Sequence, residues 1–116
     1  MTENKQTVER YMEGFRQGDH EAILACLTDD VEWIIPGVFH LRGKDAYDGE
    51  IENDAFEGHP EIDVARLTEE SDVVVAEGTV IARKKGGERM ELAMCDVFEM
   101  RDGRIRRLTS YLMERK

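Results

Sequence analysis

Residues 88–100, ERMELAMCDVFEM, show the clearest alternation of apolar and polar side chains in the chain. In a β-strand, successive side chains point to opposite faces. One face of this segment is apolar except for a single carboxylate; it reads Met90, Leu92, Met94, Asp96, Phe98 and Met100. A carboxylate in such a row must be paired, hydrogen-bonded or held neutral. Asp96 is therefore the first candidate for a functional side chain, with a fully bonded structural carboxylate as the alternative.

The segments around residues 88–100 also alternate with a period of two. They predict three further strands, at residues 62–68, 73–84 and 104–113. Gly86-Gly87 and Asp102-Gly103 have the composition of two-residue hairpin turns, because primed turns require positive φ. The second half of the chain is therefore predicted to be an antiparallel meander.

Tight turns would fix which residues face each other across this meander. A two-residue turn before residue 88 puts Glu77 opposite Asp96. A two-residue turn after residue 101 puts Thr109 opposite Asp96 on its other side, with Arg107 diagonally adjacent. We expect Glu77 and Asp96 to titrate as a coupled pair with one raised pKa, unless Arg107 reaches inward and keeps both charged.

The first half of the chain is predicted to be mainly helical. An amphipathic helix at about residues 3–17 carries one apolar stripe of Val8, Tyr11, Met12 and Phe15. A short helix begins at Asp19, a strand covers residues 31–35, and a third helix runs from residue 44 to about 57. Helices followed by a meander indicate an α+β fold. We expect a cone-shaped barrel, in which a curved, mostly antiparallel sheet wraps over about three N-terminal helices around an internal pocket.

Length and composition limit the functional classes. The 116 residues, 41% of them hydrophobic, suit a single domain over residues 1–116 with a real core. The net charge of −10 argues against nucleic acid and anionic membranes as partners. No stretch approaches the ~20 apolar residues of a membrane span. Two cysteines without an export signal indicate a cytoplasmic protein with free thiols, and the His and Cys spacings indicate no metal site.

The chain also resembles a known family, in motifs spread over nearly its whole length. The motifs are Arg10-Tyr11, Gly18-Asp19, Asp29-Asp30-Val31-Glu32-Trp33, Pro36, Arg42-Gly43-Lys44-Asp45-Ala46, Asp96-Val97-Phe98 and Asp102-Gly103-Arg104-Ile105. They are similar to motifs of the SnoaL-like proteins, polyketide-cyclase-related members of the nuclear transport factor two-like superfamily, which also includes ketosteroid isomerase. The resemblance implies a cone-shaped α+β barrel, a deep apolar pocket and a homodimer.

The resemblance carries over to the site only in part. Ketosteroid isomerase builds an oxyanion hole from a tyrosine on the first helix and a protonated aspartate on a late strand, which match Tyr11 and Asp96. Its aspartate base is replaced by Ile35, which cannot move a proton, so steroid-type isomerisation is not expected. SnoaL-type cyclases use a late-strand aspartate as acid/base, a role open to Asp96. Ser110 stands where the limonene epoxide hydrolase branch has its last aspartate, which argues against that activity.

These patterns predict a small-molecule isomerase or cyclase that needs no metal or organic cofactor and moves a proton next to the carbonyl of an apolar ligand. Asp96 would be the acid/base or oxyanion donor, assisted by Tyr11 and Glu77. The residues expected to bind the ligand are Trp33, His40, Met94, Phe98, Arg107, Thr109 and Tyr111. Tyr11 is equally consistent with a plain core position, and Trp33 is most simply a core or pocket-wall residue. The alternative function is a non-catalytic module that binds a hydrophobic ligand or dimerises.

The outer face of residues 88–100 predicts how the chain assembles. It includes Ala93, Cys95 and Val97, at positions where a monomer would show more polar side chains. We expect a homodimer that packs through this face of the sheet.

Overall fold

Two capped helices form the start of the chain in the computed structural model, which describes residues 1–115. Helix α1 (Glu3–Gln17) begins after Thr2, whose side chain accepts a hydrogen bond from the first turn. The helix ends at Gly18, which adopts the left-handed conformation with φ 65°. Helix α2 (His20–Ala25) begins after Asp19, whose carboxylate caps it. Both helices are confirmed where the sequence predicts them.

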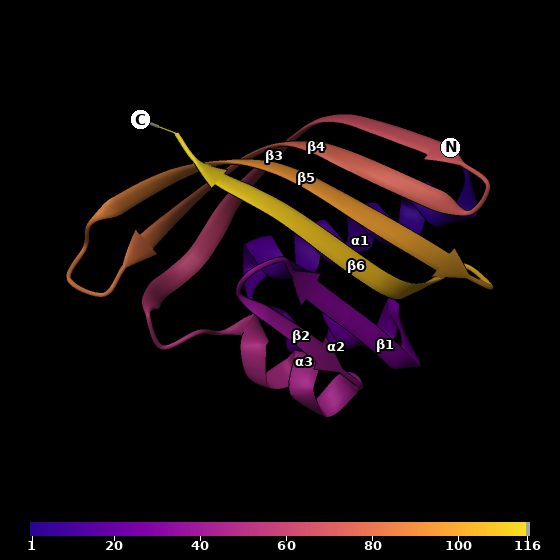
Figure 1. The fold of residues 1–116 in the computed structure, drawn as a ribbon, viewed down its shortest axis with the longest axis horizontal. Helices are drawn as coiled ribbons and strands as arrows, with labels where there is room; N and C mark the ends of the chain where they lie inside the picture. Colours follow the sequence, from indigo (N-terminus) through magenta and orange to yellow (C-terminus); the bar gives the residue numbers. More distant parts are fainter. Residues whose placement is uncertain (116) are drawn as a thin grey trace.

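One open, mixed sheet covers the helices. Along the chain follow β1 (Leu27–Ile35), β2 (Phe39–Arg42), α3 (Lys44–Ile51), β3 (Phe56–Glu70), β4 (Val73–Lys84), β5 (Arg89–Arg101) and β6 (Arg104–Glu114). The strands lie in the order β2-β1-β6-β5-β4-β3, and all neighbours are antiparallel except β1 and β6, which are parallel. The sheet arches over α1, α2 and α3 on its concave side (Figure 1). The predicted α+β fold is confirmed.

Two regions differ from the prediction. Residues 39–42 form β2, which pairs with β1 across a turn at Pro36-Gly37. Helix α3 ends at Ile51, earlier than predicted, because the chain from Phe56 onward joins β3 and pairs with the far end of β4. Pairing with a neighbouring strand has overridden a local helical pattern at this point.

The hairpin between β4 and β5 has a three-residue turn between Lys84 and Glu88, where a two-residue turn is predicted. The N–H of Lys84 donates to the carbonyl of Glu88 across this turn. The register is therefore shifted by one residue, and Ala76 rather than Glu77 lies opposite Asp96. A slip of one residue moves a side chain to the other face of the sheet. The predicted pairing of Glu77 with Asp96 is therefore wrong.

The hairpin between β5 and β6 has the predicted tight turn at Asp102-Gly103. A β-bulge then inserts one extra residue, Arg106, into β6. Beyond the bulge, Ser110 lies opposite Asp96, and Thr109 lies on the outer face of the sheet. The prediction that Thr109 lies beside Asp96 is therefore wrong, because the bulge shifts the register by one residue, as the longer turn does for Glu77.

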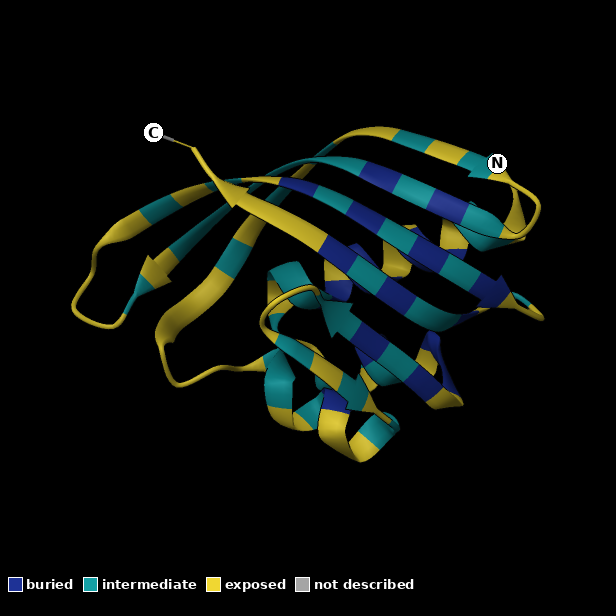
Figure 2. Cartoon of the chain, viewed as in Figure 1, coloured by how far each residue is buried: buried dark blue, intermediate teal, exposed yellow. Residues whose placement is uncertain are grey.

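The alternation of β5 is confirmed in full. Its buried positions on the concave face are Met94, Asp96, Phe98 and Met100. Burial is concentrated where the helices cover the sheet (Figure 2). The half of the sheet near the β4–β5 turn extends beyond the helices, and its concave face is only half-buried. Within residues 1–115, no helix is long and apolar enough to span a membrane.

Candidate functional site

Asp96 is a carboxyl group buried in the middle of the sheet. Its side chain lies between Ala76 on β4 and Ser110 on β6, and the residue is 7% exposed. Burial raises the pKa of the Asp96 carboxyl to about 6, and the hydroxyl of Ser110 partly opposes this rise. The oxygen Oδ1 is buried without a hydrogen-bond partner in the described part of the chain. An unsatisfied buried carboxyl oxygen is unusual in a folded protein and marks a functional candidate.

Two tyrosine hydroxyls meet close to Asp96. The hydroxyl oxygens of Tyr11 on α1 and Tyr47 on α3 lie 2.5 Å apart, and both residues are buried. Burial raises the pKa of both phenols well above the usual value. Tyr47 and then the charge of Asp96 add to the rise at Tyr11, and the charge of Asp96 adds to the rise at Tyr47. Both therefore stay protonated at neutral pH. One proton lies in the hydrogen bond between the two hydroxyls, which leaves the other phenol free to donate. Tyr11 and Asp96 thus both lie on the buried concave side, near enough for the charge of Asp96 to raise the pKa of Tyr11.

Trp33 links the same region to β1. Its indole Nε1 donates to Oγ of Ser110 at 3.2 Å. The indole stacks on the Tyr47 ring, with centroids 4.5 Å apart and an interplanar angle of 21°. Trp33 is thus a buried residue of the concave side with one directed polar contact.

Met94 and Phe98 flank Asp96 on the concave face, where the sequence places them. Phe98 is fully buried and contacts the Tyr11 ring edge-on, with centroids 5.4 Å apart. Met94 is 5% exposed and lies opposite Leu112, which is 41% exposed. The apolar surface beside Asp96 therefore continues from the closed core toward the half of the sheet that the helices leave uncovered.

Two residues of this site are missing from the sequence prediction. Tyr47 on α3 is fully buried, and its hydroxyl contacts that of Tyr11, which the sequence does not indicate. Ser110 becomes a neighbour of Asp96 through the bulge in β6. A bulge of this kind leaves no clear signal in a run of alternating side chains.

Several predicted site residues lie instead on the convex outer face, on the opposite side of the sheet from Asp96. Glu77 forms an exposed ion pair with Arg66 at 2.7 Å. Tyr111 lies opposite Cys95 on this face and is 53% exposed. Because of the shifted registers, neither residue can line the inner wall that the sequence predicts.

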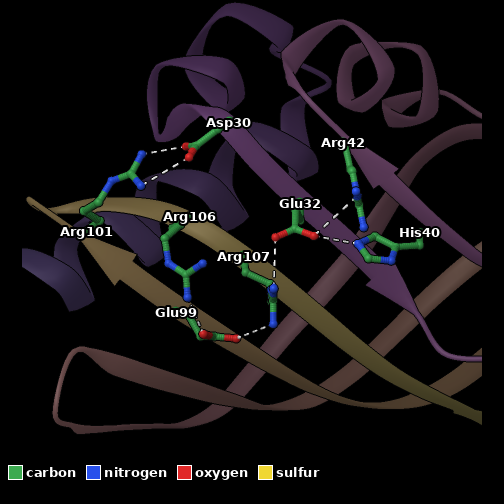
Figure 3. Close-up of polar contacts among 8 residues, drawn as sticks. All are labelled: Asp30, Glu32, His40, Arg42, Glu99, Arg101, Arg106 and Arg107. Carbon is green, nitrogen blue, oxygen red and sulfur yellow. Dashed lines mark hydrogen bonds and ion pairs between the residues drawn. The ribbon is translucent and has the colours of Figure 1, made fainter.

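His40 and Arg107 belong to an outer charged cluster of eight residues: Asp30, Glu32, His40, Arg42, Glu99, Arg101, Arg106 and Arg107 (Figure 3). His40 lies on β2, not in a loop, and Nε2 lies 2.7 Å from Oε1 of Glu32. Arg107 donates to Oε2 of the same carboxylate at 3.0 Å. His40 and Arg107, both expected to bind the ligand, therefore lie on the opposite face from Asp96, and the prediction that Arg107 faces inward is wrong.

The outer charged cluster surrounds an open hollow of about 580 Å³ lined by Asp30, Glu32, Arg42, Gly43 and Arg107. Its carboxylates are already bonded to cations. Hydrogen bonds from Arg101 lower the pKa of Asp30 to about 2, and those from His40 and Arg107 lower the pKa of Glu32. Ion pairs with lowered carboxyl pKa values stabilise the fold at neutral pH and are lost only in acid. The cluster is best explained as a structural ion-pair network.

The two hollows described in the structure both lie away from Asp96; the second, of about 310 Å³, is lined by Arg89, Glu91, Glu114 and Arg115. Aromatic side chains fill the core around Asp96: Tyr11, Phe15, Trp33, Phe39, Tyr47 and Phe98. Among residues 1–115, no group of three or more His, Cys, Asp or Glu side chains is placed to hold a metal ion. Around Asp96, the described residues therefore offer its carboxyl group, the phenols of Tyr11 and Tyr47, the hydroxyl of Ser110 and apolar walls.

Comparison with known proteins gives one family and a common fold. The family model described as a SnoaL-like domain matches residues 8–108. An LEH-like epoxide hydrolase from M. tuberculosis is 24% identical, with a TM-score of 0.85 over 96% of this chain and 83% of that one. A polyketide cyclase candidate from Xanthomonas campestris is 27% identical, with a TM-score of 0.84 over 94% and 89% of the chains. An NTF2-like protein of unknown function from Burkholderia pseudomallei reaches a TM-score of 0.91 at 22% identity over 97% and 92% of the chains. A search of curated proteins finds no match.

Proposed function

Since the chain belongs to the family of SnoaL-like domains, we propose that it is a cofactor-independent isomerase or cyclase with Asp96 as its acid/base. The observation that carries this proposal is the buried Asp96 carboxyl, whose Oδ1 has no partner within residues 1–115 and which lies close to two protonated phenols. The ligand would be a small apolar compound with a carbonyl group.

The uncovered half of the concave face supports the binding of such a ligand. Leu92 and Val80 pair with each other across β5 and β4, are half-buried, and face the same side as Met94. Leu112 continues this surface on β6. Apolar surface next to a few directed polar groups is the usual composition of a small-molecule site. A ligand on this surface could place its carbonyl end toward Asp96.

The chemistry proposed for Asp96 is proton transfer at the carbon next to that carbonyl. Ionised Oδ1 takes the α-proton, the C–H electron pair forms the enolate double bond, and the carbonyl π electrons move onto oxygen. With Tyr47 as the donor in the bond between the two phenols, the Tyr11 hydroxyl donates to this oxygen and stabilises its negative charge. Asp96 then returns the proton to another carbon. A pKa of about 6 suits both steps near neutral pH. In the alternative role, neutral Asp96 would donate to the oxygen beside Tyr11.

A second candidate function is a non-catalytic module that binds a hydrophobic ligand or dimerises. The observation that favours it is the dense aromatic packing around Asp96, with both described hollows elsewhere. In that case Asp96 would be a buried structural acid. The two functions differ in whether the protein exchanges an α-proton of a bound ketone.

Exchange of α-protons with solvent tests the proposed function without knowledge of the natural substrate. β-Tetralone, an aromatic ketone with acidic α-protons, would be incubated in D₂O with and without the protein, and loss of the α-proton signals followed by proton NMR. We expect exchange above the buffer rate, with a dependence on Asp96. Binding of the ketone with exchange at the buffer rate would instead support the binding module.

We further propose that the protein is a cytoplasmic homodimer that packs through the convex face of the sheet. This face exposes large apolar side chains, with Tyr111 53% and Met113 74% exposed, next to the half-buried Cys95. Light scattering at micromolar concentration should give twice the chain mass of 13.3 kDa, and Tyr111→Glu should give the monomer mass. A monomeric wild-type protein would contradict this proposal.

A further inference from the structure

Trp33 is the only tryptophan of the chain, and its indole N–H is committed to one acceptor. Nε1 lies 3.2 Å from Oγ of Ser110. Stacking on Tyr47 at 4.5 Å and an edge contact with Phe39 at 5.3 Å hold the indole in place. Trp33 is 9% exposed. The direction of its single donor is therefore fixed by aromatic packing.

The Ser110 hydroxyl accepts this hydrogen bond and can donate one hydrogen bond in turn. A hydroxyl offers one donor and two acceptor positions, so the hydrogen of Ser110 must point away from the indole. Asp96 lies directly opposite in the antiparallel β5–β6 ladder, where facing Cβ atoms are about 4.5–5.5 Å apart. Ser110 is 4% exposed and Asp96 is 7% exposed, so little water competes for this contact.

The two oxygens of Asp96 have different surroundings as a result. The Ser110 hydroxyl favours the ionised carboxylate and counteracts the effect of burial on its pKa. Oδ1 has no hydrogen-bond partner in residues 1–115. Ser110 faces Asp96 across the ladder, and with Oδ1 unpartnered the oxygen left for its hydroxyl is Oδ2. If Ser110 donates to Oδ2, a proton added to Asp96 goes to Oδ1.

We propose that Trp33 and Ser110 form a donor relay, from the indole N–H to the serine hydroxyl to Asp96, which leaves Oδ1 as the reacting oxygen. The relay deepens the proposed function and rests on it for its catalytic meaning, but it is present without ligand. Trp33 and Ser110 are positioning residues in this relay. When Asp96 ionises, the Ser110 hydrogen bond becomes charge-assisted and strengthens the bond from the indole behind it.

The effects of other ionisable groups on the indole signal can be distinguished from that of Asp96. Tyr11 from α1 and Tyr47 from α3 have strongly raised pKa values and stay neutral. On the outer face, His40 of β2 bonds to Glu32, the neighbour of Trp33 on β1. The variant His40→Gln removes this imidazole and serves as the control.

The single indole N–H signal of ¹⁵N-labelled protein tests the relay directly. Between about pH 4 and about pH 8, we expect this signal to titrate with the same midpoint as the Asp96 carboxyl, about 6. The titration should persist in His40→Gln and in Thr109→Ala, which changes the neighbouring residue on the outer face. It should be lost in Ser110→Ala, where the Asp96 pKa should rise by about one further unit. Ser110→Thr should restore it.

An indole signal that does not follow the Asp96 midpoint in the wild type would overturn the relay, and this measurement needs no variant to fold. An Asp96 pKa unchanged in folded Ser110→Ala would also overturn it. Failure of the proposed function is distinguishable: the indole would still titrate with Asp96, but α-protons of the ketone would exchange only at the buffer rate.

Discussion

Replacement of Asp96 by asparagine is expected to reduce α-proton exchange by about 10²–10⁴-fold, the usual contribution of a positioned acid/base. The amide has almost the same shape but can neither take nor return a proton. Ketone binding should remain within a few-fold of the wild-type value, because the apolar surface formed by Met94, Leu92 and Leu112 is unchanged. Exchange rates and ketone titrations by NMR measure the two quantities separately.

The matched control for this loss is Asp63→Asn. Asp63 is an exposed carboxylate on β3, so its replacement should leave exchange at the wild-type rate. If Asp96→Asn and Asp63→Asn exchange the α-protons equally well, Asp96 is not the acid/base. Tyr11→Phe should lower the rate less than Asp96→Asn, because it removes one donor to the enolate and leaves the proton acceptor in place.

Asp96→Asn should also change how the stability of the fold depends on pH. The folded-state pKa of Asp96 is about 6, against about 4 in an unfolded chain. A raised acid pKa means that stability is fully present below the unfolded value and is lost as the pH rises through the folded value. Two pKa units correspond to about 3 kcal/mol of unfolding free energy. The unfolding free energy of Asp96→Asn, measured relative to that of the wild type, should therefore increase by about 3 kcal/mol from about pH 4 to neutral pH.

Urea unfolding of both proteins at the two pH values measures this change. The cost of burying the amide is the same at both pH values, so it cancels in the comparison. Asp63→Asn should show no comparable gain. A difference between Asp96→Asn and the wild type that does not depend on pH would mean that Asp96 has no raised pKa in the folded state. A buried acid kept at a cost in stability is typical of a residue retained for function.

The sequence predicts the architecture well because the architecture follows from local patterns. The helix stripe from Val8 to Phe15, the cap at Asp19 and the alternation around Asp96 each depend on side chains within one element. The buried position of Asp96 follows from the same alternation. The closeness of Tyr11 to Asp96 follows from the resemblance to a known family.

The partners of Asp96 are mispredicted because they depend on single residues at turns and bulges. One extra residue in the Lys84–Glu88 turn exchanges Glu77 for Ala76, and one extra residue at Arg106 exchanges Thr109 for Ser110. Each change moves a whole strand face by one position. Gly86-Gly87 is compatible with turns of two or three residues, so its composition alone does not decide between them.

The loss of Glu77 from the site changes the mechanism in one respect. A shared proton between two carboxylates is no longer the origin of a raised pKa; burial alone raises it. Arg107, which would have kept the acid charged, bonds to Glu32 on the other face. The proposed acid/base role of Asp96 therefore depends on an apolar environment together with the hydroxyl of Ser110.

The most direct test of the acid/base role is the pKa of the Asp96 side chain itself. Carboxyl ¹³C NMR of the wild-type protein, with the Asp96 signal identified by its absence in Asp96→Asn, gives this value without any ligand. The buried carboxyl, with Oδ1 unpartnered, predicts a midpoint of about 6. A midpoint near the ordinary value of about 4 would mean that Asp96 is a fully solvated or fully bonded carboxylate, and would contradict its role as the acid/base.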